Sequence, residues 1–64
     1  MIVTIKVDNY SDMTVAALEA EMLGIDFTKV DTTTFDVVVM ESWKLDFFLS
    51  KIGHAEVMGM SDAL

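Results

Sequence analysis

His54 is the only histidine in the chain, and the chain has no cysteine. A histidine acts as a general base or a metal ligand only when a nucleophile or further ligands lie nearby. His54 follows Gly53 in a predicted turn, where a capping or solvent-exposed role is expected. Four serines could serve as nucleophiles only with a neighbouring base, and none has an evident one: Ser11, Ser42, Ser50 and Ser61. We therefore expect no catalytic residue and no enzyme activity.

The sequence also lacks the residue spacing that metal and cofactor sites require. Asp8 and Asp12 could share a cation in the first loop, but this segment has neither the glycine nor the distal glutamate of an EF-hand. The glycines Gly24, Gly53 and Gly59 stand alone, so no loop has the spacing that cradles a phosphate. We expect no bound metal and no cofactor.

The charge of the chain limits its partners. Eleven acidic residues stand against four lysines and no arginine, which gives a formal net charge of -7. Nucleic-acid binding requires clustered cations that neutralise phosphates, so direct binding is not expected. A basic protein surface is the natural complement, although net charge also keeps a protein soluble. An acidic mimic of nucleic acid is a further alternative, but the acids are dispersed among all predicted elements.

Size and composition favour association. Sixty-four residues form one domain, 1–64, near the size at which a single core is only marginally sufficient. Apolar residues make up 53% of the chain, and no disulfide can supplement the core. Oligomerisation is the remaining way to stabilise the domain. No apolar run approaches the ~20 residues that span a bilayer, so we expect no membrane contact and a cytoplasmic location, in the host cell if the protein is viral.

The apolar run Phe35–Met40 predicts a central strand that is buried on both faces. After Glu41 the apolar period changes from two to about 3.6, which indicates a helix. Elsewhere the same criteria give three more strands and one more helix. The predicted strands are Met1–Val7, Ile25–Val30, Thr34–Met40 and Ala55–Met60, and the predicted helices run from about Asp12 to Leu23 and from Trp43 to Ile52.

Polar residues and glycines predict where the two helices begin and end. Ser11 or Asp12 is the expected N-cap of the first helix, and Gly24 its C-terminal stop. Ser42 is the expected N-cap of the second helix, which Gly53 can end. The resulting order β-α-β-β-α-β is the ferredoxin-like split βαβ of the α+β class. It implies a four-stranded antiparallel sheet in the order fourth, first, third, second strand, with both helices on one face.

The element order and the polar first loop resemble regulatory domains of the ACT type. That resemblance implies a small-molecule sensor or sponge, with the ligand held at subunit interfaces. The glycine usually found in the first loop of that family is missing here, and the paired cysteines of heavy-metal-associated domains, which share the order, are absent. The ligand-binding residues that this alternative implies are Asp8, Asn9, Tyr10, Ser11 and Asp12.

More apolar surface is predicted than one small core needs. Trp43 and Phe47 lie one turn apart and opposite the face of the second helix that is expected to pack on the sheet. The first helix carries two opposite apolar stripes, Val15/Leu18/Met22 and Met13/Ala16/Ala20/Leu23, and the pattern does not decide which one packs. By strand parity, the side chains expected to point at the helices are Val3, Ile5, Val7, Phe35, Val37, Val39, Ala55 and Val57, and those expected on the uncovered face are Ile2, Val38, Met40, Met58 and Met60.

These features favour a small non-enzymatic protein-interaction module that self-associates and binds a larger protein as an inhibitor. In size, acidity and lack of catalytic motifs, the chain looks like the small inhibitors made by bacterial viruses. Among the apolar patches, Trp43 and Phe47 are the preferred partner-binding residues, because aromatic side chains dominate interface energetics. The opposing interpretation places Trp43 in the core, folded back over the ends of the strands.

Overall fold

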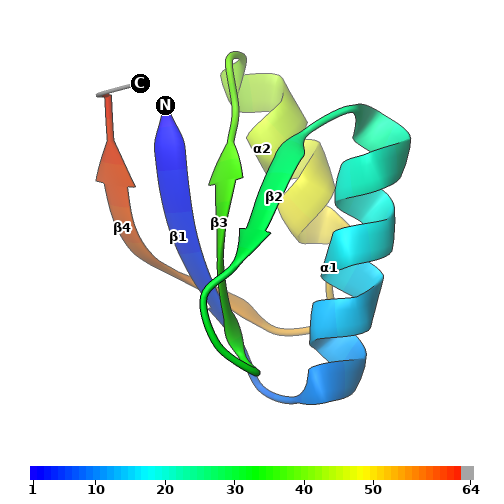
Figure 1. The fold of residues 1–64 in the computed structure, drawn as a ribbon. Coiled ribbons are helices and arrows are strands. Elements are labelled where there is room, and N and C mark those ends of the chain that lie inside the picture. The colour runs from blue at the N-terminus through cyan, green and yellow to red at the C-terminus, as the bar shows by residue number, and fades with distance from the viewer. Residues whose placement is uncertain (63–64) are drawn as a thin grey trace.

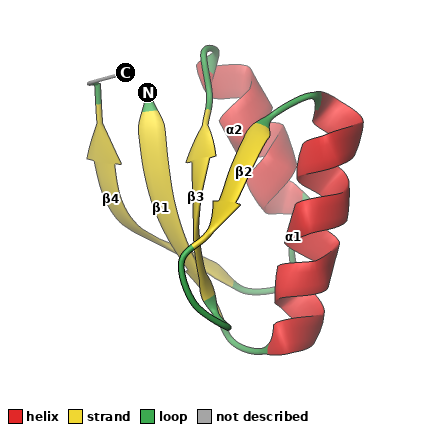
Figure 2. Cartoon of the chain, in the orientation of Figure 1, coloured by secondary structure: helices red, strands yellow, loops and turns green. Residues whose placement is uncertain are grey.

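The computed structural model describes residues 1–62 and confirms the predicted order of elements. Figure 1 shows a single sheet with both helices on one of its faces, and Figure 2 shows the short loops that join the elements. The fold is therefore α+β and of the ferredoxin-like split type. Its elements are β1 (Ile2–Val7), α1 (Tyr10–Leu23), β2 (Asp26–Lys29), β3 (Thr34–Val38), α2 (Ser42–Ser50) and β4 (Ala55–Ser61).

The sheet has the order β2-β3-β1-β4, and every neighbouring pair is antiparallel. β1 therefore lies between β3 and β4, as predicted. In Figure 1, α2 lies behind β3 and β2, α1 lies to the right of β2, and β4 forms the edge farthest from α1. Consequently the helices cover only part of the sheet.

The core lies between the helices and the covered part of the sheet. Phe35 and Phe48 are fully buried, and their rings meet edge to face at 6.0 Å between centroids. Phe27 stacks on the other side of Phe35, with centroids 4.9 Å apart. Burying each such side chain contributes roughly 1.5–3 kcal/mol to folding. The buried residues are Val3, Ile5, Val7, Met13, Ala16, Ala20, Ile25, Phe35, Val37, Val39, Leu45, Phe48 and Ile52.

The first helix starts earlier than predicted. Asn9, with extended backbone, is the N-cap, and its side-chain oxygen accepts a hydrogen bond from the Asp12 backbone N–H at 2.9 Å. The prediction of Ser11 or Asp12 as the cap was wrong, because both lie inside the first turn. Gly24 ends the helix as predicted, with φ 71, and its N–H donates to the carbonyls of the last turn. Only glycine adopts that backbone conformation without strain.

The second helix is shorter than predicted, and its caps differ. Ser42 is its first helical residue, and Glu41 holds the N-cap position without a side-chain cap bond. The Glu41 carboxylate instead accepts a hydrogen bond from Trp43 Nε1. Lys51, in right-handed backbone conformation, is the C-cap, so Gly53 does not end the helix. The predictions for Ser42 and Gly53 were therefore wrong.

β2 and β3 are antiparallel neighbours joined by a hairpin loop. The Val30 backbone N–H donates to the Thr34 carbonyl at 2.9 Å, and the Thr33 N–H donates to Asp31 Oδ1 at 2.9 Å. The hydrogen bond from Thr33 holds the pKa of the Asp31 carboxyl below its usual value. The loop is thus closed by backbone hydrogen bonds and by the Asp31 side chain.

A β-bulge in the last strand changes the predicted faces. The register between β1 and β4 shifts between Thr4 and Ile5, so that Met58 has no partner on β1. Met60 pairs with the buried residue Val3 and therefore lies on the helix side of the sheet. Its prediction on the uncovered face was wrong, because the extra residue reverses the parity of the strand beyond it.

Candidate interaction surface

One apolar stripe of α1 faces solvent. Met13, Ala16 and Ala20 are buried against the sheet, which settles the choice that the sequence left open. The opposite stripe is exposed: Leu18 to 57% and Met22 to 72%. Val15, at 39%, completes this stripe.

The second helix repeats this arrangement. Trp43 is 57% exposed and Phe47 is 46% exposed, whereas Phe48, the next residue, is fully buried. Lysine ammonium groups lie over both rings: Lys51 Nζ is 5.0 Å from the Phe47 centroid, and Lys44 Nζ is 5.8 Å from that of Trp43. The structure thus places both aromatic rings outside the core, contrary to the alternative that Trp43 is a core residue.

Both stripes lie on the same side of the molecule. Each is opposite the residues of its own helix that pack on the sheet, and the two helices form one layer (Figure 1). We call this surface the outer helical face, formed by Val15, Leu18, Met22, Trp43 and Phe47. Large apolar side chains exposed together on one side of a molecule mark interaction sites more often than isolated ones do.

The predicted patch on the uncovered face of the sheet is not continuous. Ile2 and Val38 are cross-strand partners and half-buried, so they form its only adjacent pair among residues 1–62. Met40 lies beyond the end of β3 and is 76% exposed, and Met58 is the extra residue of the bulge. Met60 lies on the helix side of the sheet and does not belong to this patch. The outer helical face therefore holds more of the exposed large apolar side chains than the predicted sheet patch does.

Four of the five residues in the small-molecule alternative form the start of α1. Asn9 caps α1, and Ser11 and Asp12 lie in its first turn. The ring of Tyr10 lies 5.0 Å from Lys29 Nζ. Asp8 lines a pocket together with residues from other segments.

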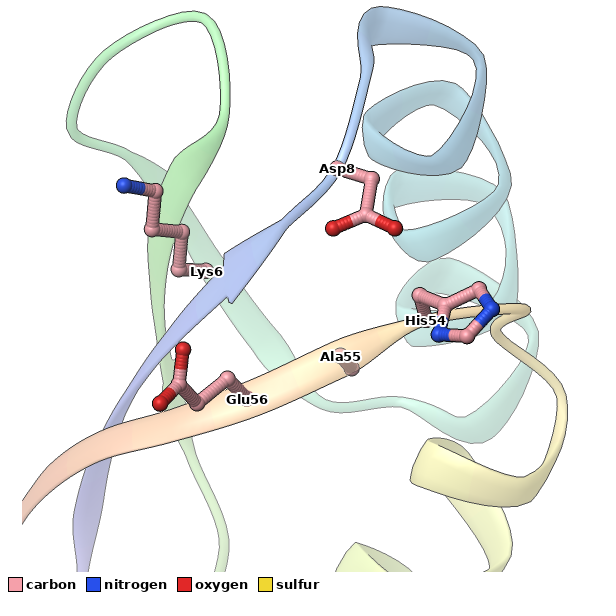
Figure 3. Close-up of a pocket in the computed structure, with 5 residues that line it drawn as sticks. All are labelled: Lys6, Asp8, His54, Ala55 and Glu56. Carbon is pink, nitrogen blue, oxygen red and sulfur yellow. The ribbon is translucent and has the colours of Figure 1, made fainter.

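That pocket was not predicted from the sequence. It has a volume of about 420 Å³ and is lined by Lys6, Asp8, His54, Ala55 and Glu56 (Figure 3). The cross-strand pairs Lys6–Glu56 and Val7–Ala55 bring these segments together. The predicted strand order contained a signal for this pocket. Antiparallel pairing of the first and last strands places the end of the first strand beside the start of the last one. All five side chains are exposed, so the pocket is open to solvent.

Two further properties concern the described part of the chain. Within residues 1–62, no three side chains of histidine, cysteine, aspartate or glutamate are grouped in a way that could hold a metal ion. No helix in these residues is long and apolar enough to cross a membrane. Comparison with protein-family models, with curated proteins and with solved structures finds no match.

Proposed function

We propose that this protein is a non-enzymatic interaction module that self-associates and uses its outer helical face to bind and inhibit a larger protein. The observation that carries the proposal is the exposure of large apolar side chains on both helices, on the side away from the sheet. Trp43 and Phe47 form the centre of the binding surface. Spaced by one turn, they make a single ridge that a groove can receive.

The aromatic pair is prepared for such contact. The Trp43 indole already has its hydrogen-bond partner in Glu41, so a partner can cover the ring without leaving Nε1 unsatisfied. Lys44 and Lys51 lie over the rings and can move aside or extend the apolar contact with their alkyl chains. Burial of a tryptophan at the centre of an interface commonly contributes ~2 kcal/mol or more to binding.

Charge defines the chemistry of the partner. With a net charge of -7, the chain attracts a protein whose apolar groove has a rim of lysine and arginine. Such attraction accelerates association more than it strengthens the complex, and salt screens it. We therefore expect the association rate with the partner to fall as the salt concentration rises, while the dissociation rate changes little.

A capture experiment with matched variants tests the proposal. The double variant Trp43→Ala/Phe47→Ala removes the ridge, and Val30→Ala removes an equally exposed apolar side chain, 57% exposed, from the hairpin loop. A stoichiometric partner should be retained by the wild type and by Val30→Ala. The purified partner should bind Trp43→Ala at least about 30-fold more weakly, which corresponds to ~2 kcal/mol. Equal affinity of Trp43→Ala and the wild type for the partner would reject the proposal.

A further inference from the structure

β4 is paired with β1, yet all seven of its residues are exposed. Both helices lie over the other part of the sheet (Figure 1). Val57 and Met60 lie on the helix side of β4, because their partners on β1 are the buried residues Ile5 and Val3. They are 40% and 57% exposed. β4 therefore presents uncovered apolar side chains beside an edge to which no strand of residues 1–62 is added.

The two edges of the sheet differ in how they resist pairing. β2 has four residues and a charged residue at each end, Asp26 and Lys29. Short, charged edge strands discourage the addition of another strand. β4 has seven residues and a single charged one, Glu56. A long edge with little charge is a template for pairing, so β4 is the edge suited to association.

The bulge in β4 limits which strand can pair with it. Residues three positions apart face opposite sides of a regular strand, but Val57 and Met60 face the same side. Side chains of a regular strand alternate without a break. Paired with β4, such a strand would have its side chains on the same faces as those of β4 either before or after Met58, but not both. An antiparallel second copy of β4 contains the same break in alternation and can match both sides.

We propose that two copies of the chain pair through β4, antiparallel and about a two-fold axis, with Val57 opposite Met60 of the second copy. The symmetry repeats this apolar pair, and it places Met58 opposite Gly59 and Glu56 opposite Ser61. Every pair outside the bulge then lies on a common face. The dimer has one continuous sheet with the helices of both copies on the same side. This inference rests on the self-association in the proposed function and assigns its location.

The register also keeps the two Glu56 carboxylates apart. The two Glu56 residues lie five positions apart along the paired strands, which is about 17 Å. That separation exceeds the screening length of about 8 Å at physiological ionic strength. Each copy has a net charge of -7, but Glu56 is the only charged residue of β4. β4 is therefore a part of the surface where two copies can approach with little charge repulsion.

The oligomeric state of matched variants tests the dimer. Sedimentation equilibrium from micromolar to millimolar concentration should show a dimer for the wild type. Met60→Lys places a charge opposite Val57 and should raise the dissociation constant at least about tenfold. Val30→Lys places the same charge at an equally exposed apolar residue in the β2–β3 loop and should leave the dimer unchanged. A wild type that stays monomeric at millimolar concentration, or a Met60→Lys dimer as stable as that of Val30→Lys, would overturn the inference.

Disulfide formation tests the register independently of any charge change, because the chain contains no cysteine. An equimolar mixture of Val57→Cys and Met60→Cys chains should form a crosslinked dimer, since directly opposed residues have Cβ atoms about 4.5–5.5 Å apart. Neither variant alone should crosslink, because its two thiols lie three positions, or about 10 Å, apart. Crosslinking of either variant alone at the yield of the mixture, or no crosslinking of the mixture, would contradict the register.

The two proposals can fail separately. If the Trp43→Ala/Phe47→Ala variant loses the dimer and Met60→Lys keeps it, self-association occurs through the outer helical face, and pairing through β4 is wrong. If Met60→Lys becomes monomeric while the double variant still captures the partner, β4 pairing stands and the outer helical face loses its proposed role.

Discussion

Phe47 and Phe48 are neighbours in the sequence but have opposite environments. Phe47 is 46% exposed beneath Lys51, whereas Phe48 is fully buried and touches Phe35. Phe48→Ala should therefore lower the free energy of unfolding by about 3–5 kcal/mol, because it leaves a cavity in the core. Phe47→Ala should lower it by less than about 1 kcal/mol. Urea unfolding of both variants measures the difference, and similar losses would contradict this assignment of core and surface.

At the residue scale, helical periodicity predicted the core side of α2 but not that of α1. The predicted core face was Leu45, Phe48, Leu49 and Ile52: Leu45 and Phe48 in α2 and Ile52 beyond its end are buried, and Leu49 is half-buried. In α1 both opposite stripes are apolar, so the pattern gives no direction. The stripe with two alanines packs inward, since small side chains allow a helix to approach the sheet closely. That choice depends on the distance between layers, which a single sequence does not contain.

At the element scale, Asn9 fixes the start of α1. Asn9→Ala should lower the free energy of unfolding by about 1 kcal/mol, because the Asp12 backbone N–H loses its acceptor. Ser11→Ala is the matched control and should change stability by no more than about 0.5 kcal/mol. Thermal or urea unfolding checks both values. A larger loss from Ser11→Ala than from Asn9→Ala would show that the helix starts where the sequence predicted.

The errors at element ends have physical causes. Asn9, Ser11 and Asp12 are all good N-cap residues within four positions, so propensity alone does not choose between them. At the start of α2, the Glu41 carboxylate accepts a hydrogen bond from the Trp43 indole, and N-cap preferences do not take such a contact into account. The β4 bulge did leave a signal in the sequence. An isolated glycine inside a predicted strand often accompanies a bulge, and Gly59 stands next to the unpaired Met58.

At the scale of the whole molecule, the order of elements determined the topology, and strand parity determined most of the core. By strand parity, Ala55 and Val57 were predicted to point at the helices, and both pair with buried residues of β1. Val57 has the expected side, but it remains 40% exposed because two short helices do not reach across four strands. The excess of apolar surface was predictable from composition. Its division between the outer helical face and β4 was not, because it depends on the bulge and on where the helices end.

The central claim is that a partner covers the outer helical face, and Trp43, the only tryptophan, reports on it directly. With fluorine-labelled tryptophan, the chain has one fluorine NMR signal from its indole, whose shift responds to exchange of H₂O for D₂O when the ring is exposed. The account predicts a solvent-sensitive signal in the free protein, because Trp43 is 57% exposed, and no change on dimerisation through β4. At saturating partner the signal should move and lose its solvent sensitivity. An unmoved, solvent-sensitive signal in the saturated complex would contradict the claim.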